Sequence, residues 1–218
     1  MWNERLIKPE LLDHAAPEEA KLSLEDLVRI NRRFGGHSVV KTALRKVAAP
    51  GAQFSLLDIG AASGDTAAIL KDLYPRATVT SLDYNETNLQ GAPSPKVIAN
   101  AFALPFRPAS FDLTHCSMFL HHFTSEQVVE LLRSFYLVCR QALIVCDLER
   151  HILPYLFLPA TKFIFGWRRL TLHDGPISVR AAFRAQELVD LAHAAGIERV
   201  EIETRRPAFR HALIARKS

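Results

Sequence analysis

Hydrophobic and polar positions change their spacing near residue 54 of the chain. Before this point, two apolar stripes at helical spacing predict two helices, the first ending near Gly35 and the second near Pro50. Ser23 and Asp26, three residues apart, resemble a helix-capping pair at the start of the first stripe. The first part of the chain is therefore expected to form a helical cap.

After this point, short apolar runs alternate with amphipathic segments. The first, residues 54–59, suits a parallel strand that is covered on both faces. Residues 77–83, 96–100, 111–118 and 142–147 predict four more strands. Residues 197–204 and 209–215 predict two further strands, and the four residues between them are too few for a crossover helix. The pattern predicts an α/β fold with an open, mostly parallel sheet, an antiparallel C-terminal hairpin strand, helices on both faces and an N-terminal helical cap.

The length and apolar content of the chain predict one domain. The 218 residues are 49% hydrophobic, which is enough to bury a core without disulfides or a structural metal. Thr124 and Gln127 form a further capping pair, which predicts a helix after the fourth strand. Within the single domain 1–218 we expect a helical cap, a ligand-binding core, an aromatic insertion, and a C-terminal helix with the hairpin, at residues 1–50, 51–150, 151–183 and 184–218.

Composition also excludes several classes of protein. Cys116, Cys139 and Cys146 form no CxxC pair and lie in apolar surroundings, which predicts buried free thiols. No uncharged apolar stretch is long enough for a spanning helix, so no integral membrane contact is expected. The charged start of the sequence differs from a signal peptide, and a cytoplasmic location is expected.

The net charge of +4 is concentrated near the C-terminus. Residues 205–218 hold five basic residues and no acidic one, and the rest of the chain is close to neutral. Glu201 and Glu203 on the preceding strand offer nearby countercharges. A broad groove for a phosphate backbone is therefore not expected, and neither is a nucleic-acid partner.

The loop after the first predicted strand carries the candidate ligand site. Gly60 and Gly64 let the backbone approach a ligand closely. Asp83 ends the next strand, and its separation from Gly60 along the sequence is typical of an acidic residue that binds ribose hydroxyls. A tight turn with a helix cap is the alternative, but these residues and the strand order together favour a nucleoside site. The carboxylate of Asp58 would repel a pyrophosphate and suits a cationic ligand, which favours S-adenosylmethionine over a dinucleotide.

Four segments together resemble the class I S-adenosylmethionine-dependent methyltransferases. They are similar to the small-molecule branch that contains the ubiquinone and menaquinone biosynthesis methyltransferases. The segments are LLDIGAASGD (56–65), SLDYN (81–85), ANAFALPFRPASFDL (99–113) and SMFLHHF (117–123). The resemblance covers about residues 50–150 and implies a Rossmann-like sheet in which the last strand lies between the fifth and the sixth.

The resemblance implies contacts to the methionine end of the cofactor. Asp58, Gly60 and Gly64 would hold this end, with Ala62 in place of the middle glycine of the family. Ser117 would contact the methionine moiety through its backbone.

The resemblance also implies contacts to the nucleoside. Asp83 would take the ribose hydroxyls, and Tyr84 would lie against the adenine. Asn100 and Ala101 would contact the edge of the adenine. Asn100 replaces the acidic residue that is usual in the family, and its amide oxygen can still accept from the adenine amino group.

Two histidines and an aspartate are the candidate catalytic residues. His121 and His122 follow the fourth strand and Asp147 ends the fifth, so an imidazole and a carboxylate meet at one edge of the sheet. Such a pair suits a general base for a hydroxyl acceptor. The alternative is that one histidine caps the next helix and the other packs in the core. No metal is expected, because adjacent histidines do not easily share an ion and no further ligand cluster accompanies them.

The aromatic residues 152–167 are the candidate acceptor site. Three interpretations are open: these residues would cover a pocket, pack as a buried helix pair or lie in a membrane interface. Pro154 and Pro159 favour a broken, movable helix that serves as both lid and core. Residues 172–176 predict a turn. His173, Asp174 and Arg180 near it are expected to be solvated loop residues rather than pocket residues.

These observations predict an enzyme of secondary metabolism. It would transfer a methyl group from S-adenosylmethionine to an oxygen or carbon of a small, largely apolar acceptor of phenolic, quinone-like or polyketide type. The alternatives are an RNA or protein methyltransferase, a non-catalytic methyltransferase-like binding protein and an NAD(P)-dependent oxidoreductase. The expected partner is the hydrophobic or aromatic acceptor, and a homodimer is left open.

Overall fold

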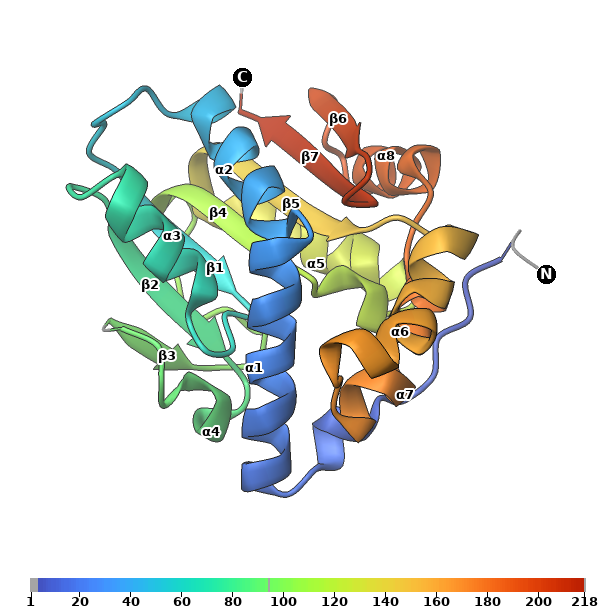
Figure 1. Cartoon of the computed structure of the whole chain (residues 1–218). Coiled ribbons are helices and arrows are strands. Elements are labelled where there is room, and N and C mark those ends of the chain that lie inside the picture. The colour runs from blue at the N-terminus through green and yellow to red at the C-terminus, as the bar shows by residue number, and fades with distance from the viewer. Residues whose placement is uncertain (1–3, 94, 218) are drawn as a thin grey trace.

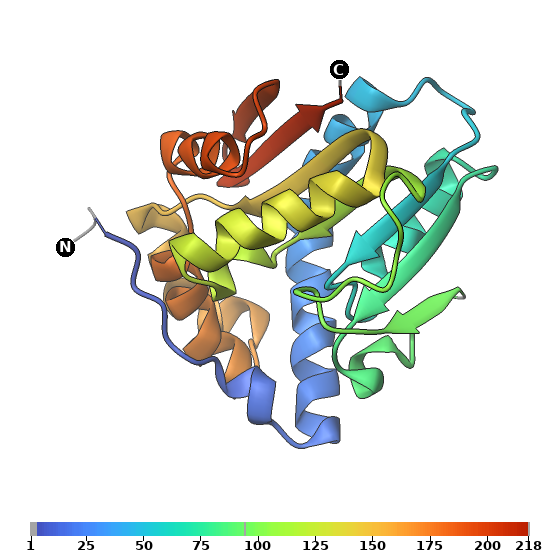
Figure 2. The same cartoon turned by 180° about the vertical axis from the view of Figure 1, so that it is seen from behind.

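The computed structural model describes residues 4–93 and 95–217, and its centre is one seven-stranded sheet (Figures 1 and 2). The strands are β1 Ser55–Ile59, β2 Thr78–Asp83, β3 Lys96–Ile98, β4 Phe111–Ser117, β5 Cys139–Leu148, β6 Val200–Arg205 and β7 Arg210–Arg216. Their order across the sheet is β3-β2-β1-β4-β5-β7-β6. Strands β1 to β5 are parallel to one another, and β7 is antiparallel to both β5 and β6. The expected Rossmann-like α/β fold is confirmed, including the inside position of the last strand.

Helices cover both faces of the sheet. They are α1 Pro17–Arg33, α2 Gly36–Val47, α3 Asp65–Leu73, α4 Glu86–Leu89, α5 Ser125–Val138, α6 Ile152–Phe165, α7 Arg169–Ala181 and α8 Ala185–Ala194, with short 3₁₀ turns η1 Leu11–His14 and η2 Leu120–His122. Helices α2 and α3 pack on one face and α5 and α8 on the other. Helices α1, α6 and α7 lie beside the sheet, and the N-terminal segment runs along α7 (Figure 1).

The core follows the alternation of side chains in the central strands. Leu56 of β1 packs with Leu44 of α2, whereas its neighbour Leu57 packs with Phe135 of α5 on the opposite face. All four side chains are buried. Each buried leucine contributes about 1.5–3 kcal/mol relative to an exposed one, so a strand that is apolar on both sides fits only between two helical layers.

The start of α1 differs from the prediction. Pro17 occupies the first turn. A backbone N–H at this position would have no acceptor within the helix, so the proline costs no hydrogen bond. Ser23 and Asp26 therefore lie inside α1, where both are buried, and the expected capping pair is wrong. The pair of Thr124 and Gln127 does form a capping box at the start of α5.

The aromatic segment forms a helix hairpin rather than a broken helix and a turn. Helix α6 continues through Pro159 and ends at Gly166. Residues 172–176, predicted as a turn, lie inside α7. A Cβ at Gly175 would lie 2.2 Å from the Cδ1 atom of Leu158, so this glycine allows α7 to approach α6 closely. The glycine and proline that suggested a turn therefore serve helix packing.

Ion pairs on the surface and the state of the cysteines were both predicted from the sequence. Arg205 pairs with Glu203 at 2.6 Å, and Arg206 pairs with Glu149. Lys46 of α2 reaches Glu203 at 3.1 Å. The three cysteines are buried and free, as expected. In the part of the chain that the structure describes, no helix has the length and apolar character needed to cross a membrane.

Candidate functional site

One cavity of about 1350 Å³ lies at the carboxyl ends of the parallel strands. It is lined on one side by the loop after β1 and the end of β2, and on the other by α1, α6, α7 and η2. Ligands of open α/β sheets bind at this edge. The volume exceeds the roughly 300–1,000 Å³ that is usual for one small ligand, so it has room for two reactants.

A buried ion pair supports the loop after β1. Asp58 and His115 are register partners on β1 and β4, and the Nδ1 atom of His115 donates to the Oδ1 atom of Asp58 at 2.7 Å. Burial opposes protonation of His115, but the hydrogen bond to Asp58 raises its pKa from 6.5 to about 10. The Oδ2 atom of Asp58 is buried and has no hydrogen-bond partner among the described residues. Asp58 also lines the cavity, so a carboxylate oxygen is left for a cationic ligand.

The loop itself is held in a tight, left-handed conformation. Gly60 has a φ of 70°, and a Cβ there would lie 2.4 Å from the ring of Phe119. Ala62, with a φ of 44°, donates its N–H to the Oδ2 atom of Asp83 at 3.0 Å. A Cβ at Gly64 would lie 2.8 Å from Ala92. The two glycines are thus needed for packing as well as for backbone conformation.

The structure brings most of the predicted cofactor residues to the cavity. Its lining includes six of the nine, namely Asp58, Gly60, Ala62, Asp83, Tyr84 and Ser117. Tyr84 is 79% exposed and so is free to cover a planar ligand. Gly64, Asn100 and Ala101 lie outside the lining, and the side chain of Asn100 accepts a hydrogen bond from the backbone N–H of Phe102.

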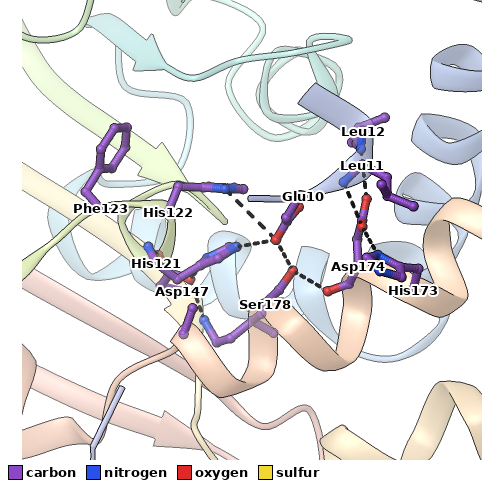
Figure 3. Close-up of polar contacts among 12 residues, drawn as sticks. Glu10, Leu11, Leu12, His121, His122, Phe123, Asp147, His173, Asp174 and Ser178 are labelled. Atoms are coloured by element: carbon purple, nitrogen blue, oxygen red, sulfur yellow. Dashed lines mark hydrogen bonds and ion pairs between the residues drawn. The ribbon is translucent and has the colours of Figure 1, made fainter. Parts of the chain in front are cut away.

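The predicted catalytic residues meet at η2, where His121 and His122 line the cavity and Asp147, which is not part of the lining, contacts His121 (Figure 3). The Nδ1 atom of His121 lies 2.7 Å from the Oδ1 atom of Asp147, and both side chains are buried. Burial opposes the charged form of each, but their mutual attraction raises the pKa of His121 and lowers that of Asp147. An ionised carboxylate only accepts, so Nδ1 carries the proton and the Nε2 atom of His121 faces away from Asp147.

His122 has the opposite electrostatic environment. Burial and the positive charge of His121 lower the pKa of His122 to about 3, which keeps its imidazole neutral at physiological pH. The two rings lie side by side with centroids 4.3 Å apart, and both line the cavity. Neither histidine caps the next helix, because Thr124 does, whereas His121 is buried as the packing alternative expected.

Glu10 joins the two histidines from the N-terminal segment. Its Oε1 atom lies 3.9 Å from the Nε2 atom of His121 and 4.0 Å from the Nδ1 atom of His122. Ser178 of α7 donates its hydroxyl proton to the same oxygen. One argument against a metal, that no further ligand accompanies the histidines, does not hold in the structure.

Asp174 fixes the segment that carries Glu10. Its two carboxylate oxygens accept the backbone N–H groups of Leu11 and Leu12, each at 2.9 Å (Figure 3). Asp174 is buried and lines the cavity, so its expected place in a solvated loop is wrong. His173 is exposed, as expected, although it lies in a helix. Arg180 is half-buried in the same helix and does not line the cavity.

The wall between the two ends of the cavity is apolar. Helix α1 turns its apolar stripe to the cavity and buries polar side chains instead, with Ser23 bonded to Thr171 at 3.2 Å. The wall is formed by Leu24, Leu27, Val28, Phe34, Phe157 and Leu158. Helix α6 thus contributes part of its aromatic surface to the cavity, whereas Phe163 of the same helix is 91% exposed.

Three polar residues of the site were missed in the sequence. His115 is a polar residue within an apolar strand, and this interruption was a usable signal for it. Glu10 and Ser178 carry no such signal, because their neighbours along the chain are unrelated to the site and they meet across 168 positions of sequence.

Comparison with known families decides the class of this fold. Residues 57–145 match the model of the methyltransferase domain family. These residues, less than half of the chain, therefore form a methyltransferase domain. The resemblance to the class I S-adenosylmethionine-dependent methyltransferases is thereby confirmed for this segment, and a structural neighbour solved with S-adenosylmethionine supports this cofactor. The branch within this family and the roles of individual residues stay predictions.

Solved structures with this fold include methyltransferases of low sequence identity. Human N-acetylserotonin methyltransferase, solved in complex with S-adenosylmethionine, is 20% identical over 84% of this chain and 52% of that chain, with a TM-score of 0.59. A possible histamine N-methyltransferase from Thermotoga maritima is 17% identical over 93% of this chain and 99% of that chain, with a TM-score of 0.61. A methyltransferase from Aquifex aeolicus is 13% identical over 81% of this chain and 88% of that chain, with a TM-score of 0.55.

These similarities show the fold and leave the acceptor open. The chain spans 52% to 66% of the length of the human protein and of the matches from Nostoc punctiforme and Bordetella parapertussis. Comparison with curated proteins finds no significant match.

Proposed function

We propose that this protein transfers a methyl group from S-adenosylmethionine to an oxygen or ring carbon of a small, largely apolar acceptor. The observation that carries the proposal is the single cavity, which joins the glycine loop to an apolar wall and to the buried histidines. A phenolic, quinone-like or polyketide compound has the matching chemistry, with an apolar body and one hydroxyl or activated carbon.

The residues at the loop end fit the cofactor. The unpaired Oδ2 atom of Asp58 suits the ammonium group, and the carboxylate of Asp83 suits the ribose hydroxyls. When bound, S-adenosylmethionine supplies a methyl group that its sulfonium has already activated. Much of the catalysis is then the task of holding the acceptor in line and excluding water.

The histidine end fits a hydroxyl acceptor. Asp147 accepts the Nδ1–H of His121, so the Nε2 atom of His121 is the proton acceptor of this pair. His122 stays neutral and lines the same part of the cavity. His122 would orient the acceptor hydroxyl, and the Nε2 atom of neutral His121 would take its proton as the methyl group is transferred.

The apolar wall also separates this proposal from its alternatives. Leu24, Leu27 and Val28 suit an apolar acceptor and offer no charge to an RNA backbone, and the arginines of the lining, Arg33, Arg205, Arg206 and Arg210, lie elsewhere in the chain. The domain match favours methyl transfer over hydride transfer.

A labelled-methyl transfer assay tests the proposal. The protein is incubated with isotope-labelled S-adenosylmethionine and a panel of phenols, quinols and polyketide or fatty acids, and the products are identified by mass spectrometry. RNA and a peptide library serve as competing acceptors. We expect label in a phenolic or quinol product. Calorimetry that shows no binding of S-adenosylhomocysteine at millimolar concentration, or label only in RNA or peptide, would contradict the proposal.

A further inference from the structure

We propose that Glu10, His121 and His122 bind a divalent transition-metal ion. One oxygen and two nitrogen atoms of these residues all lie within 4.8 Å of one another. Two imidazoles and one carboxylate are the donor set of many zinc sites that keep an open coordination position, and His121 would lose its Nε2 proton on binding the ion. In the described part of the chain, no other three histidine, cysteine or acidic residues come together in this way.

The separations between the donor atoms fit an ion placed between them. The Oε1 atom of Glu10 lies 3.9 Å from His121 and 4.0 Å from His122. An ion equidistant from three such atoms would lie roughly 2.3–2.5 Å from each, compared with zinc–ligand bonds of about 2.0–2.2 Å. Side-chain movements of a few tenths of an ångström would therefore bring all three donor atoms to bonding distance from the ion.

Neighbouring residues orient the ligands as in known metal centres. A histidine ligand usually donates its second ring N–H to a carboxylate, which fixes the ring and leaves the other nitrogen for the metal. His121 has this arrangement, because Nδ1 contacts Asp147 at 2.7 Å and Nε2 faces Glu10. Ser178 donates to Glu10 and holds its carboxylate at the histidines. These contacts preform the site.

Charges of both signs surround the site. Glu10 and Asp147 place two carboxylates next to the imidazoles, whereas Arg210 acts on His121 from the other side and the guanidinium of Arg5 bonds to the backbone oxygen atoms of His121 and Phe123. Glu10, His121 and His122 all line the cavity, so the open positions of the ion face the acceptor end.

The place of the ion suggests its task, and this step rests on the proposed function. A metal-bound hydroxyl loses its proton more easily than a free one. With the ion bound, the histidines would act as ligands instead of bases. The acceptor hydroxyl would coordinate the ion and lose its proton to solvent water, and the resulting anionic oxygen would take the methyl group from the sulfonium. Oxygen acceptors are therefore favoured over carbon acceptors.

Metal binding is tested without cofactor or acceptor, so its outcome is independent of methyl transfer. The full chain is treated with a chelator, dialysed and titrated with Zn²⁺ by calorimetry, and Co²⁺ is followed by visible absorption. We expect one ion per chain at micromolar concentration or tighter. Glu10→Gln and His122→Ala should each weaken binding by more than about 100-fold, and Asp147→Asn by about 10–100-fold.

His193→Ala is the matched control, because His193 is an exposed histidine on α8 and is not part of the cluster. Its affinity for Zn²⁺ should equal that of the wild type. His121→Ala is avoided, because the buried ring helps to hold the fold. Circular dichroism and binding of S-adenosylhomocysteine confirm that the variants are folded.

Three results would overturn the inference. They are the absence of Zn²⁺ and Co²⁺ binding to the folded wild type, equal losses in His193→Ala and His122→Ala, and unchanged affinity in Glu10→Gln. Stoichiometric binding without methyl transfer would sustain the metal site and contradict only the proposed function.

Discussion

The two ends of the cavity are built in different ways. The cofactor end comes from two short segments, residues 58–66 and 83–88, which follow neighbouring strands. The acceptor end is assembled from α1, the N-terminal segment, η2, α6 and α7, which are far apart in the sequence. Local backbone geometry determines the first end, whereas long-range packing determines the second. The residues that match the methyltransferase family, 57–145, contain the first end and η2, whereas the rest of the second end lies outside them.

The largest effect is expected at the cofactor end, from breaking the pair of Asp58 and His115. His115→Leu leaves the carboxylate buried without its counterion, which should lower the free energy of unfolding by about 3–5 kcal/mol. Urea denaturation measures this loss. The double variant with Asp58→Asn should recover part of it, because the uncompensated charge is gone. Equal losses in the single and double variants would contradict the role of the pair.

The same pair predicts a pH dependence of stability. Burial alone would lower the pKa of His115, but Asp58 raises it from 6.5 to about 10 in the folded state. The stabilisation is therefore complete below about pH 6.5 and is lost as the pH rises through about 10. We expect the stability difference between the wild type and His115→Leu to shrink by several kcal/mol over this range. Urea denaturation at three pH values measures it, and a constant difference would refute the assignment.

A smaller effect is expected where α1 docks at the acceptor end. Asp26 accepts the backbone N–H of Arg168 at 2.7 Å and the guanidinium of Arg29 at 2.8 Å. Asp26→Ala should cost about 1–3 kcal/mol, because it leaves these donors without their acceptor. Hydrogen exchange should show faster opening of α1, with unchanged binding of S-adenosylhomocysteine. Glu25→Ala, at an exposed position of the same helix, is the control and should show neither change.

The smallest effect on stability is expected from the apolar wall. Leu27→Ala removes a side chain that faces an existing cavity, so the loss should stay below about 1 kcal/mol. Leu44→Ala on α2, in the closed core, should cost about 2–5 kcal/mol. Thermal unfolding compares the two. If the proposed function holds, Leu27→Ala should also raise the KM for the acceptor. A loss as large as that of Leu44→Ala would place Leu27 in the core instead.

The correct predictions concern features that depend on residues close together in the sequence, and the missed ones depend on contacts between distant segments. The apolar run of residues 54–59 and the capping box at Thr124 follow from local rules, and the strand order follows from the family resemblance. All three are found in the structure. Asp174 was misplaced because a glycine and a proline next to it are typical of turns, and only the contact of α6 with α7 explains them as helical. Glu10 was missed because no local pattern connects it with residues more than a hundred positions away.

The polar face that α1 buries has a consequence for engineering the protein. Ser23 contacts Thr171 and Asp26 holds the backbone of Arg168, so these bonds fix both the depth and the rotation of α1 on the helix hairpin. A chimera that takes α1 from one parent and α6 with α7 from another would lose this register, even if every apolar residue were matched. The three helices are therefore one unit of exchange, and acceptor specificity should transfer between relatives only when they move together.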